Sequence, residues 1–186
     1  MIEILDDLDV LSRPHLDLAT VEMGGIALGA AAVDVSRQSI VQARSRVVAR
    51  YRGGTGIESE YHDAGGRRLT LDEVIDDAVR SDGFLHCADE LSYKVHAGTV
   101  VGFALGGHLS HFAHLASYED FLATFGKPDR TREDEVYGDL MGYDTYYWGA
   151  RRHVRWDAWD NRVSLINLGD FEGNTAPWRI CGERSS

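Results

Sequence analysis

Three strand-like segments follow one another in the last third of the chain, separated only by short turns. Residues 143–148, 153–156 and 162–168 are rich in aromatic and β-branched side chains, and residues 149–150 and 157–161 supply the turns. Connections this short join antiparallel neighbours, because a parallel neighbour needs a crossover of about a dozen residues or more. These residues therefore predict an antiparallel meander that the rest of the fold must accommodate.

Further strands are expected upstream. Residues 92–96 and 99–105 flank the dipeptide Ala97-Gly98 and predict a β-hairpin. Residues 47–51 and 57–61 carry a weaker strand pattern.

Two helices have clear start and stop signals. Thr70 and Glu73 form a capping-box pattern before apolar residues at helical spacing, and the pair Asp82-Gly83 follows as a stop. Ser117 is a good N-cap for a helix over residues 118–125, which Gly126 ends. A third helix is expected over residues 31–41, although its β-branched side chains would also suit a strand.

These elements predict an α+β fold, with an antiparallel sheet and a few short helices packed on one face. The expected units are residues 1–107, ending in the first hairpin, and residues 108–186, with the aromatic-rich meander. One continuous domain is the alternative.

The two halves share an order of elements: a short apolar segment, a small helix, and strands that end in a hairpin. The motif Gly25-Ile26-Ala27-Leu28-Gly29 lies in the first half. The second half contains Phe125-Gly126-Lys127-Pro128-Asp129, followed by Tyr146-Tyr147-Trp148. On these motifs, residues 22–170 resemble the BamE-like domain of outer-membrane assembly lipoproteins, and the β-lactamase-inhibitory proteins that carry such a unit twice.

The resemblance implies two repeated helix–meander units and a binding module rather than an enzyme, with the partner held on an aromatic-rich sheet face. The chain departs from the family pattern at three points. It has no lipoprotein signal, no Gly-x-Pro-Asp after the first expected helix, and no paired cysteines within each unit.

Charge narrows the class of partner. Thirty acidic residues against 19 basic ones give a net charge of -11. Nucleic acid and anionic membrane surfaces are therefore not expected as partners, whereas a basic protein would be attracted. The same charge could serve only to keep the chain in solution. The first residues have neither a positive start nor an apolar run, so a cytoplasmic protein is expected. The resemblance implies a bacterial one.

Aromatic and acidic side chains alternate between Glu133 and Trp159. Alternation along strands places about half of the rings on the outer face. Exposed Tyr and Trp are typical of interface hot spots, and acidic neighbours favour a basic partner. The alternative is that most of these rings belong to the core. The residues predicted to contact a partner are Asp139, Tyr143, Asp144, Tyr146, Tyr147, Trp148, Trp156, Asp157 and Trp159.

Two further patterns leave alternatives open. The basic run from Arg151 to Arg155 could bind a carboxylate or phosphate, or pair internally with Asp144 and Asp157. His108, His111 and His114 could ligate zinc. Their spacing argues against it, because neither a strand nor a helix would bring all three side chains to the same face. No metal or other cofactor is therefore expected.

The function predicted from these features is an immunity or inhibitor protein that neutralises a toxin or enzyme domain by occluding its active site. Its partner is expected to be a basic protein, and self-association is left open. The alternative is a metal-binding or small-ligand protein, or an enzyme, that uses the three histidines.

Overall fold

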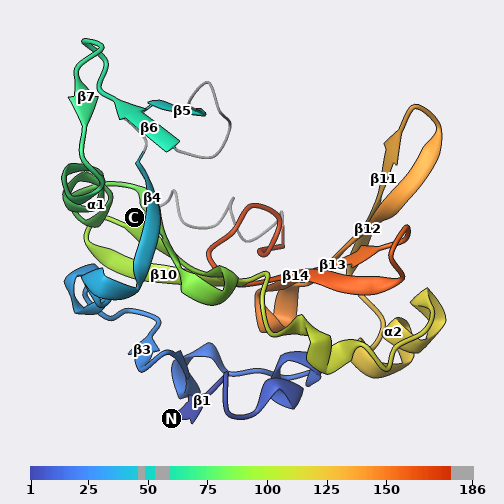
Figure 1. Ribbon diagram of the computed structural model, residues 1–186. Coiled ribbons are helices and arrows are strands. Elements are labelled where there is room, and N and C mark those ends of the chain that lie inside the picture. Colours follow the sequence, from blue (N-terminus) through green and yellow to red (C-terminus); the bar gives the residue numbers. More distant parts are fainter. Residues whose placement is uncertain (46–48, 53–58, 177–186) are drawn as a thin grey trace, which may run out of the picture. The chain divides into compact units, whose positions relative to one another are not determined.

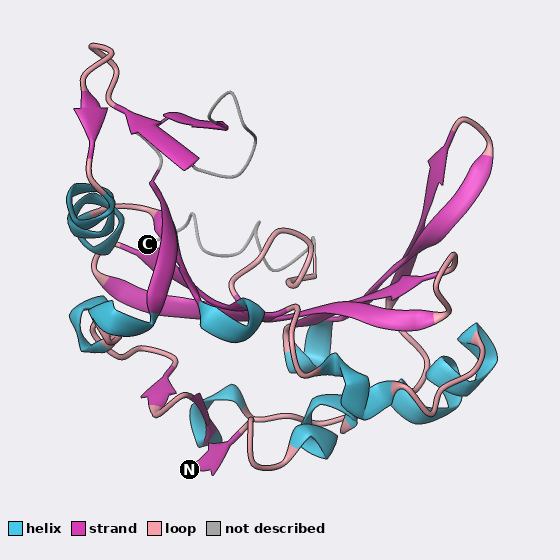
Figure 2. Ribbon diagram, viewed as in Figure 1, coloured by secondary structure: helices cyan, strands magenta, loops and turns pink. Residues whose placement is uncertain are grey.

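The computed structural model describes residues 1–45, 49–52 and 59–176 (Figures 1 and 2). These residues form mostly antiparallel sheets and two α-helices, which confirms the α+β class. The chain divides into two compact units, one of Met1–Leu28 with Gly102–Ser186 and one of Gly29–Val101. The division expected from the sequence, into residues 1–107 and 108–186, stays a prediction.

The first unit contains the meander expected near the C-terminal end of the chain. Its strands pair antiparallel in the order β11, β12, β13, β14 and the second half of β10. Their bounds are β11 Arg130–Val136, β12 Asp139–Tyr147, β13 Arg152–Asp157, β14 Arg162–Gly169 and β10 Thr99–Leu105. Strand β11 is one that the sequence pattern did not predict, because five of its seven residues are charged.

Helix α2 (Tyr118–Phe125) packs on one face of this sheet. Ser117 caps it by accepting from the Asp120 backbone N–H, and Gly126 ends it at a φ of 81°, as predicted. Phe121 and Phe125 are buried, and the Phe121 ring lies 5.6 Å from that of Trp156 on β13. The helix therefore covers the apolar side of the meander.

The remainder of the first unit is irregular. A small sheet pairs β1 (Ile2–Glu3) parallel to β2 (Val21–Met23), and β2 antiparallel to β3 (Ile26–Ala27). The Glu3 carboxylate accepts from the backbone N–H groups of Gly24 and Gly25, which holds the β2–β3 turn. Short 3₁₀ helices complete the unit: η1 Leu8–Ser12, η2 Leu18–Thr20, η6 Leu109–Phe112 and η7 Trp148–Ala150.

In the second unit, helix α1 (Leu71–Arg80) packs against strands β4 and β8. The capping box is formed: Thr70 accepts from the Glu73 backbone, and the Glu73 carboxylate accepts from the Thr70 N–H at 2.8 Å. The strand order is β10, β9 (Leu91–His96), β8 (Gly83–Cys87) and β4 (Ile40–Ser45). A separate sheet contains β5 (Ala49–Arg52), β6 (Ser59–His62) and β7 (Arg68–Leu69), and η5 spans Ala88–Glu90.

The helix expected over residues 31–41 is wrong. The structure has two 3₁₀ turns there, η3 (Ala32–Asp34) and η4 (Arg37–Ser39), and β4 begins at Ile40. The β-branched side chains of Val33, Val35, Ile40 and Val41 lose rotamer freedom in a helix, which favours extended backbone.

Candidate protein-binding surface

The two faces of the first unit's sheet differ in chemistry. Strand register puts Tyr147, Arg152 and Leu168 side by side on the face that packs against α2. The next residue of each strand pair puts Tyr146, His153 and Asn167 side by side on the opposite face. The first face is core and the second carries a polar network.

Two aromatic rings of the predicted binding set lie in the core. Trp156 is 1% exposed and tilts against Tyr118 and Phe121. Tyr147 is 6% exposed, and its hydroxyl donates to the Gly126 carbonyl oxygen at 3.2 Å. Burial raises the pKa of Tyr147 to about 12. These rings hold α2 on the sheet.

Arg152 is a buried cation with no carboxylate among its described partners. Its Nη1 donates to the carbonyl oxygens of Leu11 and Arg13, at 2.5 and 2.9 Å. Its Cζ lies 4.4 Å from the centroid of the Tyr147 ring, and its Nε and Nη2 have no hydrogen-bond partner in the described structure. Burial lowers the pKa of Arg152 to about 10. Its role is to tie the N-terminal segment to the sheet.

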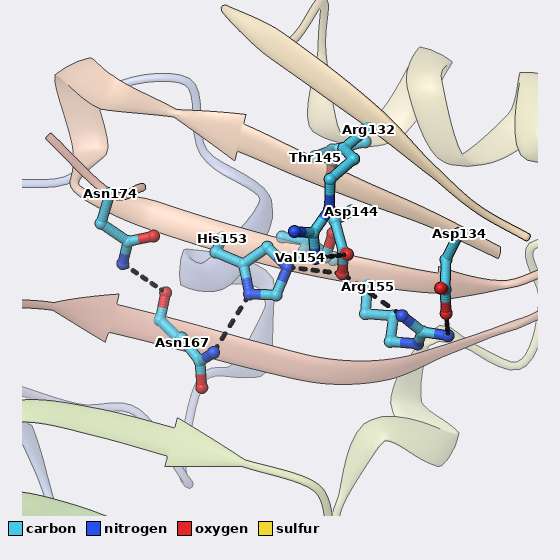
Figure 3. A network of polar contacts seen from close by, with 9 residues as sticks. All are labelled: Arg132, Asp134, Asp144, Thr145, His153, Val154, Arg155, Asn167 and Asn174. Atoms are coloured by element: carbon cyan, nitrogen blue, oxygen red, sulfur yellow. Dashed lines mark hydrogen bonds and ion pairs between the residues drawn. The ribbon is translucent and has the colours of Figure 1, made fainter. Parts of the chain in front are cut away.

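Asp144 is the centre of the polar network on the opposite face (Figure 3). Its carboxylate is 3% exposed and accepts from Arg132 Nη2 at 2.7 Å and from His153 Nε2 at 2.9 Å. Arg155 reaches Asp144 at 3.5 Å and donates to Asp134 at 2.6 Å. Burial alone would raise the pKa of Asp144, but the hydrogen bonds from Arg132 and His153 outweigh it and lower that pKa.

His153 uses both ring nitrogens inside this network. Nε2 faces Asp144, and Nδ1 accepts from the Asn167 side-chain amide at 3.0 Å, so the ring is neutral with its proton on Nε2. The Tyr146 ring stacks on it with centroids 4.9 Å apart. Burial lowers the pKa of His153, against the opposing effect of Asp144.

Four members of the predicted binding set are not exposed in the structure. All four are buried: Asp144, Tyr146, Tyr147 and Trp156. The Asp144 carboxylate lies within the ion-pair network, the Tyr146 ring stacks on His153, and the Tyr147 and Trp156 rings pack in the core. Tyr143 is half-buried against Tyr118, with ring centroids 4.0 Å apart. Trp148 is half-buried, and its indole Nε1 donates to the Gly173 carbonyl oxygen.

Four apolar side chains are exposed in or beside the two turns at one end of the same sheet. Tyr137 is 103% exposed and Trp159 is 76% exposed, and Val136 and Leu140, which lie near Tyr137 along the chain, are exposed as well. The end of the β11–β12 hairpin carries Val136, Tyr137 and Leu140, and Figure 1 shows this hairpin projecting from the neighbouring strands. Trp159 lies in the β13–β14 turn at that end, where Ala158 N–H donates to the Met141 carbonyl oxygen. We call Val136, Tyr137, Leu140 and Trp159 the tip patch.

Local structure holds both large rings of the tip patch outward. Tyr137 and Gly138 form the two-residue turn between β11 and β12, with φ values of 55° and 90°. Asp157, from the predicted set, accepts from the backbone N–H groups of Trp159 and Asp160 at 2.9 and 3.0 Å. The Asp157 carboxylate therefore shapes the turn that presents Trp159.

Carboxylates flank the hairpin part of the tip patch along the chain. Residues 133–140 contain Glu133, Asp134, Glu135 and Asp139 and no Lys or Arg. Asp134 is paired with Arg155, whereas Glu135 and Asp139 are exposed and make no ion pair with another described residue. The hairpin part of the tip patch is thus apolar with exposed acidic neighbours along the chain.

The sequence pattern identified Trp159 but did not select Val136, Tyr137 or Leu140. The signal that could have found them is the Tyr137-Gly138 dipeptide between two strand-forming runs, which indicates a two-residue hairpin turn with an exposed first residue. The run of charges in β11 obscured it.

The structure does not bring the three histidines together as a metal site. All three are exposed; His111 Nε2 lies 2.7 Å from Asp9, and His114 Nδ1 donates to the His111 carbonyl oxygen. In the described ranges, no group of three or more His, Cys, Asp or Glu side chains could hold a metal ion.

A cleft in the second unit is occupied by its own ion pairs. It is lined by Asp63, Arg67, Leu69, Glu73, Asp76, Asp77 and Arg80. Arg67 donates to Asp63 and Glu73, Arg37 to Asp76, and Ser45 to Asp77. Each lining carboxylate already has a donor, so the cleft is a weaker candidate than the tip patch.

No helix among residues 1–45, 49–52 and 59–176 is long and apolar enough to cross a membrane. Comparison of the chain with protein-family models, with curated proteins and with solved structures found no match.

Proposed function

We propose that this chain is a protein-binding module of the immunity or inhibitor type, which binds a basic protein through the tip patch. The observation that carries the proposal is the presence of four exposed apolar side chains in or beside the two turns at one sheet end, with exposed carboxylates in the same segments. Such side chains bury apolar area on binding, and such carboxylates steer a basic partner toward them.

The rest of the first unit suits this role. The Asp144 network and the α2 core support β12 and β13, the strands that lead to the tip patch. A rigid support lowers the entropy lost on binding. Binding, rather than catalysis, is the activity we propose.

The tandem arrangement implied by the BamE-like resemblance is part of the proposal. It is supported by the order of elements after each α-helix. Helix α1 precedes β8, β9 and β10, and α2 precedes β11 to β14, with neighbours in each series adjacent in the sheet. Neutralisation of a toxin or enzyme domain is the consequence we propose for binding.

The test is affinity capture from extracts of the source organism, followed by measurements with the purified partner. The bait is the wild-type chain, a Leu140→Ser/Trp159→Ala double variant, or a Val33→Ser control, which removes an exposed apolar side chain elsewhere. We expect one basic protein to bind wild type and control in stoichiometric amount and to lose at least about tenfold in affinity for the double variant. A partner that binds all three equally would refute the tip patch as the site.

Inhibition needs its own measurement. The purified partner's activity should fall to baseline at one equivalent of wild-type chain and persist with the double variant. Full activity in the saturated complex would leave binding intact and refute the inhibitor role.

A further inference from the structure

Tyr137 occupies a backbone conformation that a tyrosine adopts at a cost. Its φ of 55° is in the left-handed region, where a Cβ is crowded and where Asn, Asp and Gly are preferred. Both central residues of a two-residue type I′ hairpin turn need positive φ, and Asn-Gly is the favoured pair. The turn here is Tyr137-Gly138, so the first position carries a residue poorly suited to it.

No described contact of the Tyr137 side chain with the rest of the fold offsets this cost. The side chain is 103% exposed, and no hydrogen bond, ion pair or ring contact joins it to the described part of the chain. Residues in sparsely populated backbone conformations are concentrated at recognition and catalytic sites. The strain and the exposure are independent observations on one residue.

We infer that Tyr137 is the principal contact residue of the tip patch, and that it binds in an apolar recess rimmed by Lys or Arg on a basic protein. This inference rests on the proposed function and deepens it. Glu135 and Asp139 are exposed two residues before and two residues after Tyr137, and their carboxylates would face the basic rim. A second copy of the chain fits poorly, because it carries the same acidic tip and a net charge of -11.

The chain contains a matched control for the backbone effect. Ala97-Gly98 joins β9 to β10 as a second two-residue turn, with φ values of 47° and 81°, and Ala97 is exposed. Tyr137→Asn and Ala97→Asn both place the preferred residue at the first turn position. Each should raise the thermal midpoint, by about 2–4 °C for a chain of this size. Only Tyr137→Asn should weaken binding.

The first experiment uses the full chain with the photo-crosslinker p-benzoyl-L-phenylalanine at position 137, at position 159, or at position 41 as an exposed control, in cells of the source organism. We expect position 137 to give one adduct, with a basic protein, through a segment that contains Lys or Arg and borders a recess. The purified partner should bind Tyr137→Phe within about threefold of wild type, and Tyr137→Asn at least about tenfold more weakly.

The outcomes separate the two proposals. An adduct with a basic protein from position 159 and none from position 137, or wild-type affinity of Tyr137→Asn, overturns the role of Tyr137 and leaves the binding function standing. A thermal midpoint that rises for Ala97→Asn and not for Tyr137→Asn removes the argument from strain. No adduct from either position, or adducts only between copies of the chain, overturns both proposals.

Discussion

His153 Nε2 lies 2.9 Å from Asp144 Oδ1, and this hydrogen bond joins two buried groups whose pKa values are both lowered. Asn167 donates to the other ring nitrogen, and Arg132 and Arg155 face the same carboxylate. The fold therefore holds a neutral imidazole beside an ionised carboxylate. This pair stabilises the sheet at the strands that lead to the tip patch.

The His153 pKa makes stability depend on pH. Because that pKa is lower in the folded chain, the unfolded chain binds more protons once the pH falls below the ordinary histidine value of about 6.5. Stability should therefore decrease from about pH 7 towards pH 5, and less steeply for His153→Gln. Urea unfolding at a series of pH values measures this; equal slopes for both proteins would contradict it.

Removal of the Asp144 charge should be costly. Asp144→Asn leaves Arg132 and Arg155 without their shared acceptor and should destabilise the chain by about 2 kcal/mol, since hydrogen bonds to charged groups contribute about 1.5–3 kcal/mol. The control is Asp160→Asn, which breaks the exposed pair with Arg162 and should cost under about 1 kcal/mol. Equal losses in chemical denaturation would show that the network is not a support.

The two tryptophans at the end of β13 should behave in opposite ways. Trp156→Ala empties a core site and should cost about 3–5 kcal/mol, whereas Trp159→Ala removes an exposed ring and should change stability by under about 0.5 kcal/mol. Thermal unfolding followed by circular dichroism distinguishes them. A large loss for Trp159→Ala would mean that its ring packs into the fold.

Arg152 stabilises by its contacts more than by its charge. Arg152→Met keeps a long apolar stem against Tyr147 and removes a buried cation with no carboxylate partner in the described structure. Arg152→Ala loses the stem as well and leaves a cavity. We expect the Met variant to be more stable than the Ala variant by about 2 kcal/mol. Equal free energies of unfolding would contradict this packing role.

The fold was largely predictable where one local rule decided the structure. Ser117 and the Thr70–Glu73 capping box marked both helices, and short turns forced the meander of residues 143–168. Strand β11 was not predictable from periodicity, because its charged side chains lie on an exposed edge strand that only pairing with β12 defines.

The binding surface was harder to predict. Alternation showed that Tyr146 and Tyr147 lie on opposite faces, but both faces are covered, one by the α2 core and one by the polar network. A sheet face that is buried by ion pairs and hydrogen bonds does not show the alternation of apolar and polar residues from which burial is predicted. Tyr137, which is exposed, was not selected for a different reason: charged residues on both sides of its turn hide the hairpin pattern.

Hydrogen–deuterium exchange of the chain, alone and saturated with its captured basic partner, tests the proposed surface most directly. Amides of residues 133–140 and 157–161 should exchange more slowly in the complex, while those of the exposed histidine segment, 108–114, should be unchanged. Protection confined to residues 108–114, or to any segment outside the two turns, would contradict binding through the tip patch.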